Sequence, residues 1–229
     1  MVNYNTKEME YISNKNPVMK ALVNHYGKLE KGRTQDIYVS LVLHIISQQL
    51  SNTVSYALIR KYINHIGEIN PENVLVAGAD AICDCGISRK KADYIIALSK
   101  GVIEKKYDFS LLEDMSDAEA TNYLTQIKGV GKWTAEMILE FTMGRLNVFC
   151  FDDVALQNGI KKAHGFKTLS KLRFERLRRS YSPYCSVASL YYYSYNDDKS
   201  GWKVLSPCLA KGNREKYVTQ TRSNDNEHR

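Results

Sequence analysis

Apolar residues recur at helical spacing in one segment after another along this chain of 229 residues, and alternating, strand-like runs are scarce. A spacing of three to four residues places apolar side chains on one face of a helix. We therefore predict an all-α fold. The expected helices cover residues 17–26, 35–49, 52–66, 71–77, 79–85, 89–105, 117–127, 132–143, 153–162, 170–179 and 187–195.

Two local signals mark helix ends. Ser116 and Glu119 have the spacing of a capping box, in which the serine accepts from a first-turn amide and the glutamate reaches back to the cap. Gly144 suits the left-handed stop of the helix that ends near Met143.

Beyond residue 206 the chain is polar and charged, and we expect this tail to be disordered.

The charge of the chain favours a polyanionic partner. The formal net charge is +7, and clustered Lys and Arg bind phosphates by releasing counterions, although many basic proteins merely have a solvated positive surface. The most apolar segment, residues 38–50, is interrupted by polar side chains and is too short to span a bilayer. We expect no membrane role.

The cysteines read as reduced thiols. No CxxC pair and no secretory signal is present, so neither a disulfide framework nor a zinc site is indicated, and we expect a cytoplasmic protein, associated with the nucleoid in a prokaryote. The five cysteines are Cys83, Cys85, Cys150, Cys185 and Cys208.

A glycine-rich hairpin lies between two predicted helices. Gly129 and Gly131 flank Val130, and glycines permit positive φ and let backbone amides approach a phosphate at the start of the next helix. Val130 is expected to tuck inward, while Lys128 and Lys132 add positive charge. Taken alone, such a segment is more often an ordinary helix–helix turn than a DNA-binding hairpin.

A pair of acids follows at the start of another predicted helix. Asp152 and Asp153 stand where an N-cap is expected, and capping is the structural interpretation of both residues.

Together these motifs resemble those of the helix-hairpin-helix DNA glycosylases, and the nearest branch is DNA-3-methyladenine glycosylase II. The resemblance runs from about Pro17 to Asn196. It is carried by IKGVGKWTAEMIL (127–139) and VFCFDDVALQNGI (148–160), with ISQQLS (46–51), GISRKKA (86–92) and PYCSVAS (183–189).

The resemblance implies two helical subdomains with the active site in the cleft between them. We expect residues 1–34 to pack with the C-terminal subdomain and residues 35–144 to form a helical subdomain ending in the hairpin. Residues 145–205 are expected to form the C-terminal helical subdomain, which carries the catalytic aspartate, and residues 206–229 the tail.

The implied activity is hydrolysis of the N-glycosidic bond of alkylated bases, of the 3-methyladenine or 7-methylguanine type, in damaged duplex DNA. Family resemblance assigns the catalytic carboxylate to Asp153, which would stabilise an oxocarbenium-like sugar. Asp152 is then a cap or a hydrogen-bonding neighbour. An alkylated purine already carries positive charge and leaves readily, which reduces the need for a general acid.

Departures from the bifunctional relatives imply a monofunctional enzyme. Those relatives place a lysine nucleophile where this chain has Trp133, and Lys132, one residue earlier, is turned by about 100° on a helix. Their iron–sulfur cluster also needs four closely spaced cysteines, which are absent here. We therefore expect no strand cleavage, no iron–sulfur cluster and no required cofactor.

The resemblance also assigns the base pocket and the DNA contacts. Trp133, Met137 and Tyr193 are candidate walls for the extruded base, although a tyrosine cluster such as 191–193 is often core packing. Gln49, or alternatively Leu50, is the candidate wedge that fills the gap in the duplex, while the structural interpretation of Gln49 is a helix cap. The candidate DNA-binding residues are Lys128, Gly129, Val130, Gly131, Lys132, Thr134, Gln48, Gln49, Leu50 and Ser51.

In relatives, hairpin carbonyls hold a monovalent cation that bridges to a DNA phosphate. The matching carbonyls here are those of Thr125, Ile127 and Val130, which would hold Na⁺ or K⁺.

Three other functions remain open alongside alkylbase excision. One is a catalytically silent hairpin module that binds DNA, another is a glycosylase for oxidised or deaminated purines, and the third is a lyase, which lacks its lysine here. We expect the protein to act as a monomer.

Overall fold

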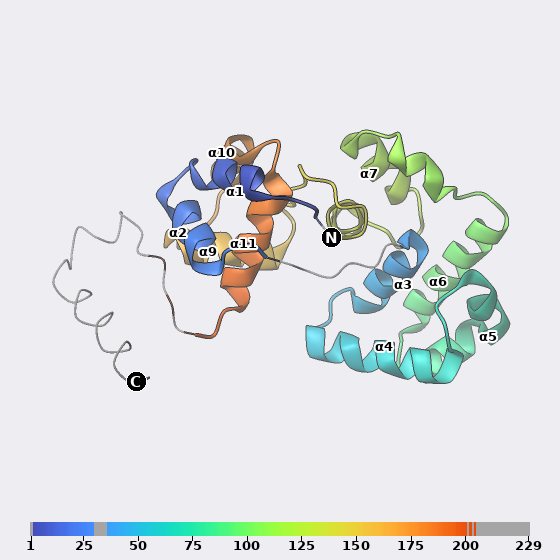
Figure 1. The fold of residues 1–229 in the computed structure, drawn as a ribbon. Helices are drawn as coiled ribbons and strands as arrows, with labels where there is room; N and C mark the ends of the chain where they lie inside the picture. The colour runs from blue at the N-terminus through green and yellow to red at the C-terminus, as the bar shows by residue number, and fades with distance from the viewer. Residues whose placement is uncertain (1, 30–35, 201, 203, 205–229) are drawn as a thin grey trace. The chain divides into compact units, whose positions relative to one another are not determined.

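The computed structural model describes residues 2–29, 36–200, 202 and 204, and within these residues all regular secondary structure is helical (Figure 1). This confirms the predicted all-α class. The predicted disordered tail, Gln35 and Cys208 lie outside the described residues. In the part of the chain that is described, no helix is long and apolar enough to cross a membrane.

The chain divides into two compact units. Unit 1 comprises residues 1–2 and 31–150, and unit 2 comprises residues 3–30 and 151–229. The main division therefore falls between residues 150 and 151, whereas the sequence motifs suggested 144 and 145. The N-terminal segment belongs to the same unit as the C-terminal helices.

Unit 1 is built around α3. Its side chains Leu41, Val42, Ile45 and Ile46 are fully buried, and the helix packs against α4, α6 and the π-helical turn η2. The elements of this unit are α3 (Ile37–Ser47), α4 (Asn52–Ile66), α5 (Pro71–Asp84), α6 (Arg89–Ile103), the 3₁₀ turn η1 (Phe109–Glu113), α7 (Asp117–Thr125), α8 (Lys132–Met137) and η2 (Ile138–Thr142).

Unit 2 joins the two ends of the described chain. The blue helices α1 and α2 pack against the orange helix α11, which is buried along nearly its whole length and also packs against α9 (Figure 1). The elements are α1 (Thr6–Ser13), α2 (Pro17–Tyr26), α9 (Val154–His164), α10 (Lys171–Tyr181) and α11 (Cys185–Asp197).

Local sequence signals predicted several helix ends correctly. Helices α2 and α4 begin and end at the predicted residues. The capping box of Ser116 and Glu119 is formed, and Gly144 adopts a positive φ of 74°. Gly78, at φ 75°, interrupts α5 where the sequence suggested two separate helices. These features depend on contacts within three or four residues, which explains why the sequence reveals them.

Three elements were not predicted or differ from the prediction by more than two residues at one end. The helix expected over 132–143 is α-helical only to Met137 and then widens into the π-helical turn, in which the Met143 amide bonds to the Ile138 carbonyl. Helix α1 was not predicted, because Ile12 is its one buried side chain and the apolar pattern is weak. It has a capping box of Asn5 and Glu8 instead. The short turn η1 was also not predicted.

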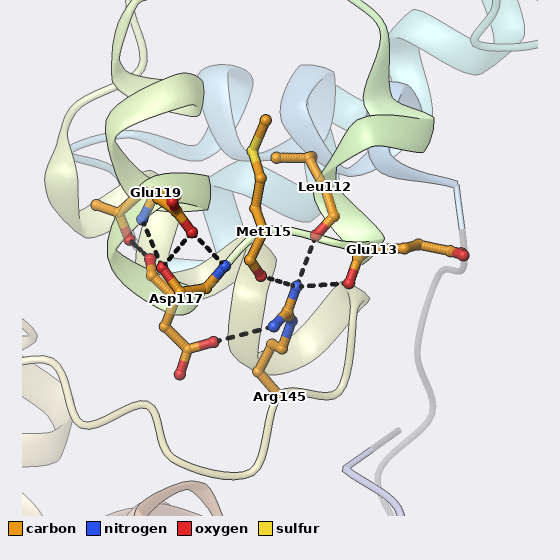
Figure 2. Close-up of polar contacts among 8 residues, drawn as sticks. Leu112, Glu113, Met115, Asp117, Glu119 and Arg145 are labelled. Atoms are coloured by element: carbon orange, nitrogen blue, oxygen red, sulfur yellow. Dashed lines mark hydrogen bonds and ion pairs between the residues drawn. The ribbon is translucent and has the colours of Figure 1, made fainter.

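Arg145 fastens the segment before α7 to the chain that follows η2. Its Nη2 donates to the carbonyls of Leu112 (2.6 Å) and Met115 (2.8 Å), and its Nη1 lies 3.4 Å from Asp117 Oδ1 (Figure 2). A guanidinium is suited to this role because its donors diverge in one plane. The contact holds the start of α7, and hence the hairpin that follows it, within unit 1.

Candidate functional site

The hairpin reverses the chain between α7 and α8. The Val130 amide donates to the Ile127 carbonyl at 3.0 Å, and Gly129 has φ +91°. Gly131 is the N-cap of α8 with φ −89°, so only the first glycine needs the left-handed region. No side chain caps α8, and its first amides therefore lack the side-chain acceptor that a Ser or Asp would supply.

Steric limits explain the first glycine. A Cβ on Gly129 would overlap the ring of Tyr94 on α6. Val130 is buried, as predicted, with 5% of its surface exposed. Lys128 and Lys132 are exposed, and Lys132 Nζ lies 3.7 Å from Glu136 Oε1. The hairpin therefore presents backbone and two lysines while its apolar residue points into the core of unit 1.

A groove of about 480 Å³ runs along the hairpin. It brings together residues predicted from two separate motifs, the segments 46–51 and 127–139, and adds four that the site prediction did not contain, Ser88, Lys90, Lys91 and Tyr94. Three of these four, Ser88, Lys90 and Lys91, lie in the segment 86–92 that carries part of the family resemblance, and Tyr94 lies two residues beyond it. We call this the hairpin groove; its lining is Gln48, Gln49, Ser88, Lys90, Lys91, Tyr94, Gly129, Gly131, Trp133 and Thr134.

Trp133 and Met137 differ in how much surface they offer. Trp133 is partly exposed and lines the hairpin groove, and its ring meets His44 edge to face at 5.9 Å. Burial lowers the pKa of His44 to about 4, so this neighbour is neutral at pH 7. Met137 is buried, with 3% of its surface exposed, so it has little surface with which to contact a ligand.

The segment expected to supply the wedge connects α3 to α4. Gln48, and not Gln49, is the C-cap residue of α3, so the interpretation of Gln49 as the cap is wrong. Gln49 lies beyond the cap with φ +59° and is exposed, and Leu50 is 37% exposed. Ser51 caps α4 by accepting the Val54 amide. Two exposed side chains are thus held between two helix ends.

Within unit 2, Asp153 is the N-cap of α9. Its Oδ1 accepts the Leu156 amide at 2.7 Å, and only 5% of the residue is exposed. The preceding turn is secured by Gln157, whose Nε2 donates to the Phe151 carbonyl at 2.6 Å, and by the edge-to-face contact of Phe151 with Phe174 on α10. A buried carboxylate is therefore fixed in position by its own helix and by the turn before it.

The neighbouring acid has a different environment. Asp152 is exposed, and Asp153 is the residue whose side chain caps α9. The expectation that Asp152 caps the helix is therefore wrong. The cap needs the extended backbone immediately before the first helical residue, and that position is Asp153, with ψ 110°.

The tyrosine run on α11 is mainly structural. Tyr191 donates to the Gly27 carbonyl at 2.8 Å, and the hydroxyl of Tyr192 lies 2.6 Å from that of Tyr181. Tyr193 is the most exposed of the three, at 8%. It is thus the member of the run that retains some accessible surface, in the same unit as Asp153.

The carbonyls proposed to hold a cation lie at the end of α7. Thr125 is the last residue of that helix, where carbonyls carry partial negative charge, and the Ile127 carbonyl already accepts the Val130 amide. Among the described residues, no three His, Cys, Asp or Glu side chains are grouped as metal ligands.

The all-α fold and the glycine hairpin between α7 and α8 are those of a helix-hairpin-helix protein, and comparison with known proteins specifies the family. The chain belongs to the HhH-GPD superfamily of base excision DNA repair proteins, whose family model matches residues 42–183. This confirms the family resemblance deduced from the motifs.

Named relatives agree with this family. A putative DNA-3-methyladenine glycosylase of Bacillus subtilis is 30% identical over 68% of this chain and 57% of its own length. DNA-3-methyladenine glycosylase 1 of Schizosaccharomyces pombe is 30% identical over 69% of this chain and 73% of its own. The chain therefore spans little more than half of the bacterial relative.

A solved structure is also similar. The 3-methyladenine DNA glycosylase of Schizosaccharomyces pombe in complex with abasic DNA superimposes with a TM-score of 0.76 at 26% identity, over 82% of this chain and 96% of that one.

Proposed function

We propose that this protein is a monofunctional DNA N-glycosylase that hydrolyses the N-glycosidic bond of alkylated bases in duplex DNA, with Asp153 as its catalytic carboxylate. The observation that carries the proposal is the buried, rigidly held carboxylate of Asp153 in a chain that also has the hairpin. A module that only binds DNA needs the hairpin, and it could cap α9 equally well with an uncharged Ser or Asn. The relatives named for 3-methyladenine support the alkylated-base class.

The carboxylate would act on charge that develops in the sugar. As the glycosidic bond breaks, C1′ acquires oxocarbenium character, and a negative group that is already oriented stabilises it without reorganising. The cap hydrogen bond from Leu156 holds Oδ1 of Asp153, so rotation of the side chain is restricted. Water would then complete the hydrolysis at C1′, and the base would leave as a neutral purine because its alkylation supplied the positive charge.

The same geometry argues against a lyase reaction. Trp133 stands where lyases have their lysine, and the neighbouring Lys132 is exposed and paired with Glu136. A Schiff base needs an unprotonated amine at the sugar. We therefore expect strands to remain intact after base release. Trp133 instead offers an aromatic face to an extruded, electron-poor base, as does Tyr193 with its smaller accessible surface.

The hairpin would bind the phosphate backbone. Its amides at the start of α8 and the side chains of Lys128 and Lys132 suit a phosphate, and these contacts carry no base specificity. If a monovalent cation binds, the carbonyls of Thr125, Ile127 and Val130 would hold it, and it would bridge the hairpin to a phosphate oxygen. Damaged duplex DNA is thus the proposed partner.

The test is base release from methylated duplex DNA by the wild type and by Asp153→Asn. Asparagine caps a helix about as well as aspartate, so the variant removes the charge and keeps α9. We expect release to fall by about 10²- to 10³-fold, while duplex affinity remains. Asp152→Asn is the matched control, because it removes the adjacent, exposed charge; its release should equal that of the wild type.

The chromatographic and gel readouts separate the alternatives. Free methylpurines with intact strands before alkaline treatment support the proposal and identify the lesion. Wild-type protein that binds duplex and releases no base from methylated, deaminated or oxidised DNA would leave the silent binding module. Strand breaks that precede alkaline treatment would contradict the monofunctional assignment.

A further inference from the structure

A lysine of α6 grips the end of α3. Lys91 Nζ donates to the Ile46 carbonyl at 2.8 Å and to the Gln48 carbonyl at 2.7 Å. The last carbonyls of a helix have no intrahelical partners, and an ammonium near them also complements the helix dipole. Lys91 is partly buried, and this burial lowers its pKa. The ammonium is therefore partly shielded from water where it meets these two carbonyls.

The same end of α3 is tied to the hairpin from its other side. The Gln48 side-chain Nε2 donates to the Gly129 carbonyl at 2.9 Å and to Thr134 Oγ1 at 3.3 Å. Thr134 is buried, so this bond anchors Gln48 to a fixed part of α8. Residue 48 is thus joined by its carbonyl to α6 and by its side chain to the hairpin.

The next residue has a backbone conformation that requires such support. Gln49 has φ +59°, a region that side chains other than glycine rarely adopt and that costs free energy. Beyond it, the Leu50 amide bonds to the Ser47 carbonyl at 3.1 Å, and Ser51 begins α4. The exposed side chains of Gln49 and Leu50 therefore point from a short, strained segment whose preceding residue is held from two directions.

We propose that Lys91 is a positioning residue: by holding the carbonyl end of α3, with Gln48 tying that end to the hairpin, it keeps residues 49 and 50 in the geometry that inserts into duplex DNA when a base is extruded. The inference rests on the proposed function. It implies that the wedge, residues 49 and 50, and the phosphate-binding hairpin move together, because Gln48, which precedes the wedge, is hydrogen-bonded to Gly129 of the hairpin.

A direct role for Lys91 in DNA binding is the competing explanation, and its neighbour provides the matched control. Lys90 lines the same hairpin groove and is exposed, with its Nζ 5.9 Å from the Tyr94 ring centroid. A lysine that binds a phosphate contributes about 0.9 to the slope of log affinity against log salt. A lysine whose ammonium is held by carbonyls contributes nothing to that slope.

The experiment compares Lys91→Met with Lys90→Met and the wild type. Methionine keeps an unbranched stem and removes the ammonium. Single-turnover release is measured for 7-methylguanine paired with cytosine and for the same base in a one-nucleotide bulge, where extrusion costs little. For Lys91→Met we expect release from the paired duplex to fall by about 10- to 100-fold, release from the bulge by less than about threefold, and an unchanged salt slope. Lys90→Met should not discriminate between the two substrates.

A second readout does not depend on catalysis. The affinity for a duplex carrying a tetrahydrofuran abasic analogue is divided by the affinity for intact duplex, and Lys91→Met should bring this ratio close to one. Gln48→Glu, which cannot donate to the Gly129 carbonyl, should also bring this ratio close to one. Lys91→Arg keeps a cationic donor and should give the wild-type ratio. These two variants keep the proposal testable if Lys91→Met does not fold.

Each contrary result has a defined meaning. Equal losses on paired and bulged substrates would show a merely structural lysine, and a salt slope reduced by about 0.9 would show a direct phosphate contact. Either result overturns the proposal. If the wild type releases no base at all, the proposed function fails, whereas the abasic-to-intact ratio still decides the role of Lys91.

Discussion

The hairpin of unit 1 and the Asp153 turn of unit 2 are built in opposite ways. The hairpin exposes backbone, an uncapped helix start and the side chains of Lys128 and Lys132. Asp153 is buried, with 5% of its surface exposed, and its carboxylate accepts a hydrogen bond from the first turn of its own helix, α9. A surface that binds a polyanion benefits from exposed cations, whereas a carboxylate that must act on one atom benefits from rigidity and a dry environment.

Glycines illustrate the same contrast. Gly129 is needed because the hairpin requires φ +91° and because a Cβ would overlap the Tyr94 side chain. Gly159, on α9, is helical, and a Cβ there would overlap the Tyr192 backbone carbonyl of α11. A side chain can move aside more easily than a packed helix backbone. The hairpin is therefore the more adaptable of the two regions.

The largest effect should come from Gly159→Ala. We expect a loss of about 3 kcal/mol in the free energy of unfolding, because α9 and α11 must separate. Gly129→Ala should cost about 2 kcal/mol through backbone strain and should also weaken duplex binding. Urea unfolding measures the free energy of unfolding of both variants, and titration with duplex DNA measures the affinity of Gly129→Ala. A Gly159→Ala protein as stable as the wild type would show that the α9–α11 contact is not rigid.

Acid should destabilise both units through their histidines. Burial lowers the pKa of His44 in unit 1 to about 4, and burial with nearby Arg173 lowers the pKa of His164 in unit 2 to about 4. The histidines of the unfolded chain bind protons near pH 6.5. The free energy of unfolding is therefore unaffected by these histidines above pH 6.5 and falls as the pH drops from 6.5 towards 4. The expected loss at pH 5 is about 2 kcal/mol for each histidine.

Urea unfolding at pH 7.5 and pH 5.0 measures this dependence. His44→Gln and His164→Gln should each reduce the difference between the two pH values. If neither substitution alters it, these histidines are as accessible to protons in the folded protein as in the unfolded one.

The smallest effect should come from a single hairpin lysine. Lys132→Gln should reduce the slope of log affinity against log salt by about 0.9 and leave the free energy of unfolding within about 1 kcal/mol of the wild type, because the Lys132 side chain is 66% exposed while its partner Glu136 is 16% exposed. Lys100→Gln, which removes an exposed charge from α6, is the control. An equal change of slope in both variants would show a general effect of net charge and no particular role for the hairpin.

Local features of this protein could be predicted from its sequence. Helical periodicity indicated the all-α class, and the positions of Ser116, Gly78 and Gly144 indicated a cap, a break and a stop that the structure confirms. The paired acids and the glycine hairpin identified the family. Each of these signals depends on residues that are neighbours in the chain or on a motif whose order is preserved.

The environments of the candidate site residues could not be predicted in this way. Nothing in the pair Asp152 and Asp153 shows which side chain is buried, and the structure assigns the cap and the burial to the second. Likewise, Tyr191 is committed to the Gly27 carbonyl, 164 residues away, and Tyr192 to the hydroxyl of Tyr181 on α10. Such differences depend on which face of a helix another helix covers.

The sequence by itself determined most of the helices, several of their caps, the hairpin and the family, because those depend on periodicity and on hydrogen bonds between near neighbours. Only the tertiary structure decided that Lys91 reaches Ile46, 45 residues away, and that Gln48 reaches Gly129, 81 residues away. Contacts over such separations form only when packed helices bring their ends together, and a pattern along the chain carries no record of that geometry.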